Sequence, residues 1–218
     1  MMFYFFKIPS FIHKIYPKYL WTMPSKPKAI YLTFDDGPTP EITDWVMETL
    51  KEYNAKATFF CEGKNVEKHP ELVQKLDSEN HSIGNHSYSH YEGWKTNTTD
   101  YIADVEKASI VIENALKGSI KYTSQSKKLF RPPYGKIKAS QAKSLQNLGY
   151  TIVMIDVISG DFAQNLIPKK SLKKLLKHTK SGSIVVFHDS KKAFRILKQV
   201  LPKALAIWSK QGYEFLAL

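Results

Sequence analysis

Short apolar runs alternate with longer amphipathic stretches along the chain. The runs are rich in β-branched and aromatic residues and predict strands at residues 29–34, 57–61, 82–85, 128–130, 151–155, 183–187 and 212–216. The stretches between them have helical spacing and predict helices over about 39–50, 64–76, 99–116, 138–147, 169–178 and 191–210. We expect the first helix to begin with Thr39 as its N-cap and Pro40 as its first helical residue, because both residue types are favoured there.

The repeated order of strand and helix predicts an α/β fold with about seven parallel strands joined by crossover helices. Polar residues follow five of these strands, among them Asp35, His86, Arg131, Asp161 and His188. In a barrel the carboxyl ends of all strands meet on one face, whereas an open sheet would spread these residues into a row. We therefore expect a closed or nearly closed barrel with the polar residues gathered at one mouth.

Composition limits the kinds of site that the chain can build. The 218 residues are 43% hydrophobic and 24% charged, which is typical of a protein with a sizeable core. The single cysteine, Cys61, excludes internal disulfides and zinc sites made of several thiolates, so a metal would need histidine and carboxylate ligands. The net charge of +12 fits a solvated basic surface or contact with anionic polymers or membranes. We find no nucleic-acid-binding motif and expect no nucleic-acid partner.

The first 27 residues form an arm before the predicted barrel domain of residues 28–218. Residues 1–6 are apolar and aromatic, but Lys7 and Pro9 end this run well short of the roughly 18 to 20 residues of a membrane span. No usual cleavage site follows, and we predict no standard secretory signal. Aromatic residues and lysines alternate as far as Tyr19, so the arm should either pack on the domain or lie at a membrane surface. This pattern is compatible with the cytoplasm and with the periphery of the cell envelope.

Two pairs of residues have the spacing of a metal and proton-transfer site. Asp35 and Asp36 end the first strand, where adjacent side chains point in different directions and can take separate tasks. His86 and His90 are four residues apart, which brings two imidazoles to one side of a turn. Two imidazoles and one carboxylate make a three-ligand zinc site with an open position. Taken separately, an ordinary Asp-Gly-Pro turn and a chance pair of surface histidines would also explain these residues.

Two later segments add groups suited to acyl transfer. Arg131 precedes two prolines, which lack N–H groups, so the first backbone donor after Arg131 is the N–H of Tyr134. The prolines hold this N–H in a rigid turn, where it can serve as a donor to an oxyanion. A stiff loop with a structural arginine is the alternative interpretation. His188 ends the sixth strand, and Asp161 is a candidate partner that would fix its tautomer and raise its pKa.

Taken together, five segments resemble the motifs of the polysaccharide deacetylases, which are also called carbohydrate esterase family 4 or NodB-homology domains. The segments are Thr33-Phe34-Asp35-Asp36-Gly37-Pro38, His86-Ser87-Tyr88-Ser89-His90, Arg131-Pro132-Pro133-Tyr134-Gly135, 156–162 and 184–189. Their order matches the family, and the resemblance extends from about residue 28 to residue 218. It implies a distorted (β/α) barrel, a divalent metal, and hydrolysis of an N-acetyl group, or less often an O-acetyl group, on a sugar.

The resemblance also implies roles for single residues. Its metal ligands correspond to Asp36, His86 and His90. Asp35 resembles the general base, with Arg131 as the partner that holds it. Tyr134 resembles the residue whose backbone N–H faces the oxyanion. His188 resembles the general acid, with Asp161 behind it.

The substrate pocket departs from the family pattern at two positions. Phe162 stands where the family usually has tryptophan, and Val186 stands where it usually has leucine. Both positions wall the acetyl pocket in relatives, so substrate preference is expected to differ more than activity. Trp94, in the polar loop after His90, is a further candidate because a sugar ring can stack on an indole.

The expected function is that of a metal-dependent hydrolase that removes N-acetyl groups from an N-acetylglucosamine-containing glycan, either peptidoglycan or a chitin-like polymer. The expected cofactor is a divalent metal, zinc in the first place, with cobalt and nickel as alternatives. We expect a monomer with an acetylated glycan as its substrate. The competing hypotheses are a cyclic amide or imide hydrolase of the same fold and a non-catalytic binder of anionic glycans.

Overall fold

A computed structural model describes residues 6–25, 27–119, 127–163 and 165–218. Its strands are β1 (Ala29–Asp35), β2 (Thr58–Cys61), β3 (Ser82–Asn85), β4 (Lys128–Phe130), β5 (Tyr150–Ile152), β6 (Val157–Ile158), β7 (Ile184–His188) and β8 (Glu214–Leu216). Its α-helices are α1 (Ser10–Ile15), α2 (Ile42–Lys51), α3 (Gly63–Lys68), α4 (Pro70–Ser78), α5 (Thr98–Ala115), α6 (Ala139–Asn147), α7 (Pro168–His178) and α8 (Phe194–Lys210). None of the helices in these ranges is long and apolar enough to cross a membrane.

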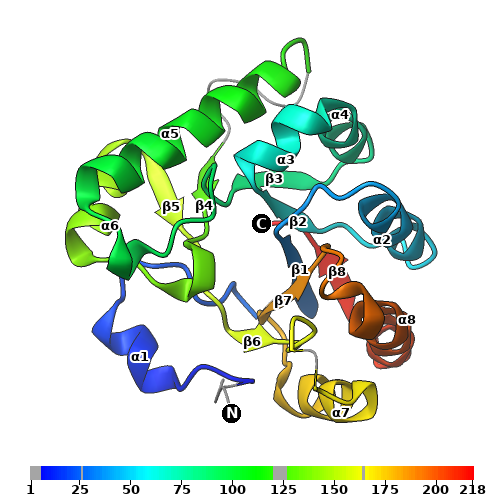
Figure 1. Ribbon diagram of the computed structural model, residues 1–218. Helices are drawn as coiled ribbons and strands as arrows, with labels where there is room; N and C mark the ends of the chain where they lie inside the picture. Colours follow the sequence, from blue (N-terminus) through cyan, green and yellow to red (C-terminus); the bar gives the residue numbers. More distant parts are fainter. Residues whose placement is uncertain (1–5, 26, 120–126, 164) are drawn as a thin grey trace.

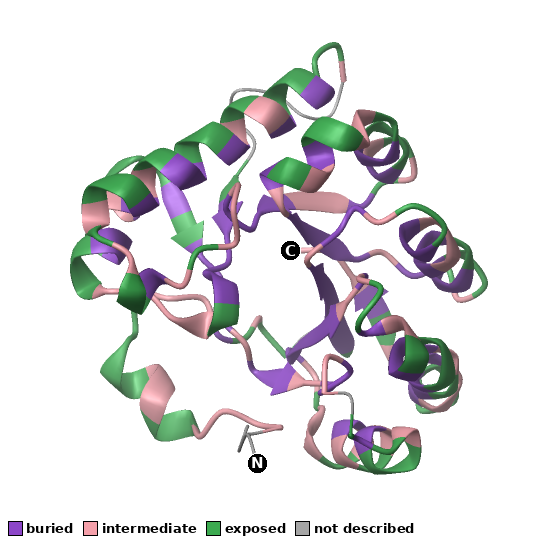
Figure 2. Ribbon diagram, in the orientation of Figure 1, coloured by how far each residue is buried: buried purple, intermediate pink, exposed green. Residues whose placement is uncertain are grey.

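The strands form one curled sheet in the order β5-β4-β3-β2-β1-β7-β6, and β8 pairs with β1 at its amino-terminal half. All of these pairings are parallel, and the longer helices surround the sheet (Figure 1). Buried residues line the strands, and the outward sides of the helices are exposed (Figure 2). The predicted α/β distorted barrel is therefore confirmed, with the two-residue strand β6 as an element that hydrophobic patterning missed.

The N-terminal arm, whose described residues are 6–25, contacts both ends of the curled sheet. Lys7 forms an antiparallel bridge with Val157 of β6, and Leu20 forms a parallel bridge with Val153, which directly follows β5. The Lys7 ammonium also forms an ion pair with the buried carboxylate of Asp156. The arm thus joins the two ends of the sheet, although a domain boundary at residue 27 stays a prediction.

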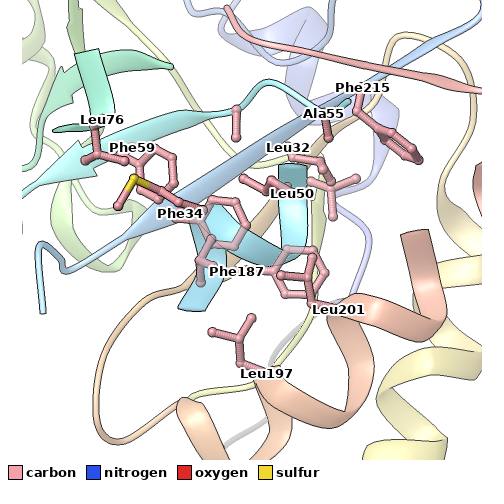
Figure 3. Close-up of a cluster of buried hydrophobic side chains, with 14 of the residues drawn as sticks. Leu32, Phe34, Leu50, Ala55, Phe59, Leu76, Phe187, Leu197, Leu201 and Phe215 are labelled. Atoms are coloured by element: carbon pink, nitrogen blue, oxygen red, sulfur yellow. The ribbon is translucent and has the colours of Figure 1, made fainter. Parts of the chain in front are cut away.

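The main core lies between the sheet and the surrounding helices, among which α8 and α2 contribute the most residues (Figure 3). All seven residues of β1 are buried, as expected for a central parallel strand that is covered on both faces. The Phe34 ring stacks on Phe59 at 5.0 Å and on Phe187 at 5.8 Å between ring centroids. These contacts fix β1, β2 and β7 against one another, and the ends of these strands carry the polar groups described below.

Two sequence predictions about helix boundaries were wrong. Helix α2 begins at Ile42 with Glu41 as its N-cap, not at Thr39 and Pro40, because the Thr43 hydroxyl accepts a bond from Thr39 N–H and donates to Asp189. These bonds hold the preceding residues in a loop. The helix predicted over 64–76 is divided at His69, since the residue before a proline is disfavoured in the helical conformation.

Candidate active site

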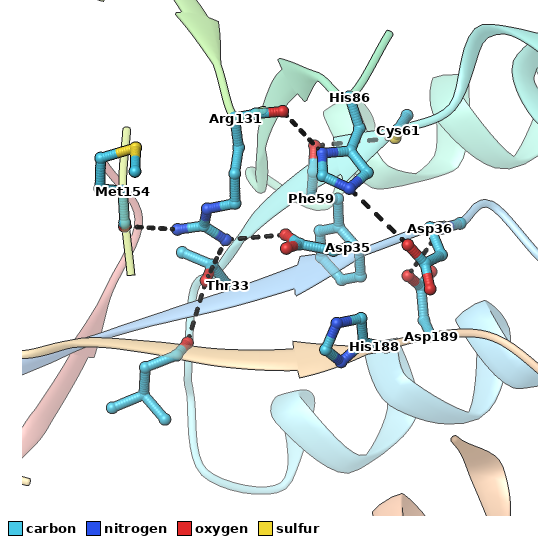
Figure 4. Close-up of polar contacts among 12 residues, drawn as sticks. Thr33, Asp35, Asp36, Phe59, Cys61, His86, Arg131, Met154, His188 and Asp189 are labelled. Carbon is cyan, nitrogen blue, oxygen red and sulfur yellow. Dashed lines mark hydrogen bonds and ion pairs between the residues drawn. The ribbon is translucent and has the colours of Figure 1, made fainter. Parts of the chain in front are cut away.

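The register of the sheet brings the predicted polar residues to one end of the barrel. Asp35 and His188 are paired positions at the ends of β1 and β7. Asn85, which ends β3, is paired with Phe130, so His86 and Arg131 follow the two strands side by side. Figure 4 shows Asp35, Asp36, His86, Arg131 and His188 around a common centre. The convergence expected for a barrel is thus present.

Asp36, His86 and His90 form a group whose ligand atoms all lie within 4.8 Å of one another. The Asp36 Oδ1 atom lies 3.7 Å from His86 Nε2 and 3.4 Å from His90 Nε2. Burial lowers the pKa of His86 to about 4, which keeps its imidazole neutral. Although burial alone would raise the pKa of Asp36, its bond to His90 and the nearby imidazoles hold it below its usual value. A carboxylate and two imidazoles with one open side suit a zinc-type divalent cation.

The loop that carries both histidines is held by side chains beneath it. The Asp104 carboxylate accepts bonds from the backbone N–H groups of Tyr88 and Ser89, each at 2.9 Å. Asn85 accepts a bond from Ser87 N–H at 2.7 Å. The carbonyl oxygen of Arg131 lies 2.8 Å from His86 Nδ1, which leaves Nε2 directed toward Asp36. These contacts orient the His86 ring and fix the loop that carries His90 before any ligand binds.

Asp35 is held by the guanidinium group of Arg131, which is only 1% exposed. The Arg131 NH1 group donates to Asp35 Oδ1 and to the Thr33 hydroxyl, both at 2.7 Å. Its guanidinium lies 4.1 Å from the centre of the Phe60 ring. One oxygen of the Asp35 carboxylate, Oδ1, is therefore bound to a fixed positive charge. The other oxygen, Oδ2, takes no part in this bond.

His188 and Asp161 form the second charged pair of the site. His188 Nδ1 lies 2.7 Å from Asp161 Oδ1, and the His188 backbone N–H donates to Asp161 Oδ2 at 2.9 Å. Burial lowers the pKa of His188, but the charge and hydrogen bond of Asp161 outweigh it and raise this pKa to about 10. The imidazole is thus held protonated, with Nε2 as its second N–H donor. The Phe162 ring packs edge-on against it at 5.2 Å.

The remaining candidates lie at the rim or beneath the site. Tyr134 is 62% exposed, and its ring lies edge-on to His90 at 4.7 Å. Trp94 is 59% exposed, donates from Nε1 to the Ile137 carbonyl at 3.2 Å, and lies below the Lys136 ammonium. Val186, by contrast, is fully buried within β7, so it underlies the site and does not line an open wall.

Sequence reasoning missed two acidic residues at this mouth. Asp189 is 1% exposed and accepts bonds from Gly37 N–H at 3.1 Å and from the Thr43 hydroxyl at 2.6 Å. A Cβ atom at Gly37 would overlap this carboxylate, so Asp189 fixes the turn that carries Asp36. Glu62 directly follows β2, and burial raises its pKa to about 7. The strand-end rule that identified Asp35 would have identified both residues.

Comparison with known proteins agrees with this geometry. A family model described as polysaccharide deacetylase matches residues 22–153. A peptidoglycan-N-acetylglucosamine deacetylase of Bacillus cereus is 34% identical over 200 residues, which cover 91% of this chain and 90% of the relative. The crystal structure of the Bc1960 peptidoglycan N-acetylglucosamine deacetylase superposes with a TM-score of 0.85 at 29% identity and covers 95% of this chain and 94% of that chain.

One structural neighbour limits what fold similarity alone implies. BA3943 of Bacillus anthracis, described as a family 4 pseudoenzyme, has a TM-score of 0.77 at 25% identity over 91% of this chain and 66% of that chain. The fold therefore also occurs in a protein described as inactive. Catalysis depends on the side chains at the site, and two of these, Asp161 and His188, lie outside the residues matched by the family model.

Proposed function

The chain belongs to the polysaccharide deacetylase family, and from this premise we propose that it removes N-acetyl groups from an N-acetylglucosamine-containing glycan, with peptidoglycan as the favoured substrate. The observation that carries the proposal is the joint presence of three kinds of group at one mouth. These are the three candidate metal ligands, the Asp35–Arg131 pair and the His188–Asp161 pair. A glycan-binding protein without catalysis would need neither of the two buried ion pairs.

Asp36, His86 and His90 would hold the divalent metal, most simply zinc. Two imidazoles, each neutral when it binds a metal, and an ionised carboxylate match the ligand preference of that ion, and cobalt and nickel accept the same ligands. When bound, the metal supplies a Lewis acid that polarises the acetyl carbonyl and favours ionisation of the attacking water. Hydrogen bonds to Asp104 and Arg131 fix the loop that bears the histidine ligands.

Asp35 and His188 would divide the two proton transfers of amide hydrolysis. Asp35 accepts the proton of the attacking water at Oδ2, because Arg131 occupies Oδ1. His188 donates a proton from Nε2 to the leaving amine, because Asp161 occupies Nδ1. The products are acetate and a free amine on the sugar. The Tyr134 backbone N–H would stabilise the tetrahedral oxyanion.

Aromatic groups at the rim would contact the sugar. Tyr134, beside His90, and Trp94 both expose large ring surfaces, and exposed rings of this kind stack on sugar faces. Phe162 lies against the proposed acid His188 and would border the acetyl methyl group. Val186, which is buried in β7, would lie beneath the pocket.

Acetate release from a panel of acetylated glycans tests the proposal. The panel comprises peptidoglycan, chitin oligomers, poly-N-acetylglucosamine and O-acetylated xylan, each assayed with zinc, cobalt or nickel. We expect metal-dependent acetate release from the N-acetylated members, with peptidoglycan highest. Hydrolysis of a cyclic imide without acetate release from any glycan would instead favour the alternative hydrolase reaction.

The Asp161→Asn variant should change the pH profile in a defined direction. The Asp161 charge keeps the pKa of His188 near 10, above its ordinary value of 6.5. Without that charge, burial lowers the pKa, so the protonated acid is lost at a lower pH. We expect the alkaline limb of kcat/KM to move down by about 1 to 3 pH units. An alkaline limb that does not move, measured beside the surface control Asp44→Asn, would contradict His188 as the acid.

A further inference from the structure

Positive charge is segregated along the chain. Residues 1–34 contain five lysines and no acidic residue, and residues 162–188 contain six lysines and no acidic residue. The rest of the sequence contains 21 lysines and arginines against 20 acidic residues, so these two segments carry eleven of the twelve net charges. Such segregation is not needed for folding, and it creates a local field that favours an anionic partner.

The lysines of α7 face solvent on one side of the helix. Ser171 and Leu175 are the buried residues of α7, whereas Lys169, Lys173 and Lys177 are exposed and spaced four residues apart. Residues with this spacing lie one above another on a helix surface. Among the described residues, none of these three lysines has a carboxylate within ion-pair distance. Their charges are therefore free to act on a partner.

The N-terminal arm exposes apolar side chains next to further lysines. Its inward side packs on the domain through Ile12, Tyr19 and Trp21. On the outward side, Phe11 and Ile15 are each 60% exposed and Tyr16 is 48% exposed. Lys14 lies between Phe11 and Ile15 in the sequence, and Lys18 follows Tyr16; both lysines are also exposed. A solvated arm would gain nothing from these outward apolar residues, but an arm that meets a lipid surface would bury them.

The arm is hydrogen-bonded to the segment that follows α7, and its residue Phe6 contacts α7 itself. The Met23 N–H donates to the Gly182 carbonyl at 2.8 Å, and the Ser181 hydroxyl donates to the Ser25 carbonyl at 2.7 Å. The Lys174 ammonium lies 6.0 Å from the centre of the Phe6 ring. In Figure 1, α1 and α7 lie along the same lower edge of the barrel, and Figure 2 shows their outer sides exposed.

We propose that this face, formed by α1 and α7 and called the basic apolar face below, docks on the surface of an anionic lipid bilayer. The lysines are attracted to lipid phosphates, and Phe11, Ile15 and Tyr16 enter the boundary between headgroups and acyl chains. A soluble polyanion would also attract the lysines, but it offers no apolar phase for Phe11 and Ile15. The combination of both features therefore favours a membrane over a charged polymer.

The experiment is sedimentation of the full chain with lipid vesicles. Vesicles of phosphatidylcholine alone are compared with vesicles in which about 30% of the lipid is phosphatidylglycerol, as in an anionic membrane surface. We expect binding to the anionic vesicles that is lost in high salt. The triple variant Lys169→Glu, Lys173→Glu, Lys177→Glu should reduce the partition coefficient roughly a hundredfold, and the double variant Phe11→Ser, Ile15→Ser should reduce it about tenfold.

A matched triple variant controls for total charge. Lys51 of α2, Lys68 of α3 and Lys117 just after α5 are exposed lysines elsewhere on the molecule, and their change to Glu alters the net charge by the same amount. This control should bind anionic vesicles with at most a few-fold loss, because the changed charges lie away from the basic apolar face. Equal losses in both triple variants would overturn the proposal. It would also be overturned if the Phe11→Ser, Ile15→Ser variant bound as well as the unchanged chain, since the face would then be a site for polyanions and not for lipid.

Discussion

Replacement of Asp35 by asparagine should reduce kcat for acetate release by about two to four orders of magnitude and leave the metal content unchanged. The side chain keeps its shape and an oxygen that can accept from Arg131 NH1, which lies 2.7 Å from Asp35 Oδ1. It loses the basic oxygen that would take the proton of the attacking water. None of the three candidate metal ligands is touched, because these are Asp36, His86 and His90. Steady-state kinetics and metal analysis of the same preparation measure both quantities.

The Asp35→Asn substitution also removes a charge next to Arg131, and this loss can lower the stability of the fold. Removing one partner of a buried ion pair can cost about 3 to 5 kcal/mol of stability, and Arg131 is almost fully buried. The melting temperature is therefore measured in parallel, and the rates are compared at a temperature at which the variant is folded. Asp44→Asn serves as the matched control, since Asp44 lies on the surface and pairs with Lys75. Turnover by Asp35→Asn within a few-fold of the unchanged chain would remove Asp35 as the base.

Hydrophobic patterning was sufficient for the fold because the strands are buried on both faces. Runs such as residues 29–34 and 183–187 have no other stable location than the centre of a covered parallel sheet. The position of the site followed from the same argument, since Asp35 and His188 end two adjacent strands. The hydrophobic pattern did not predict strand β6, because its two residues, Val157 and Ile158, are too few to produce a periodic signal.

The contacts that hold the site could not be read from the sequence. Asp189 binds Gly37 and Thr43, which are about 150 positions away along the chain, and Asp104 binds the loop of Tyr88 and Ser89 from α5. Such bonds depend on where the backbone runs in space, and no local spacing reports them. The same is true of the start of α2, where a tertiary contact through Thr43 overrides the local preference for Thr39 and Pro40.

Simultaneous replacement of His86 and His90 by alanine should lower the metal content from about one ion per chain to almost none. A single carboxylate, Asp36, would remain of the three ligand groups, and one monodentate ligand does not hold zinc against a purification. Acetate release should fall to the background rate. It should not return when zinc is added in excess, because the variant lacks the ligands that bind the metal. Metal analysis of the purified chain and the acetate assay give the two measurements.

Two histidines outside the site provide the matched control for this last experiment. His69 lies between α3 and α4, and His178 ends α7, so their joint replacement by alanine removes the same number of imidazoles without touching the three candidate ligands. This control should retain about one ion per chain and its activity. If the His86→Ala, His90→Ala chain still carried one tightly bound ion, the ligands would lie elsewhere, and the roles of Asp35 and His188 would have to be argued around another centre. If the metal were lost and acetate release nevertheless continued, the residues would bind a cation that hydrolysis does not need.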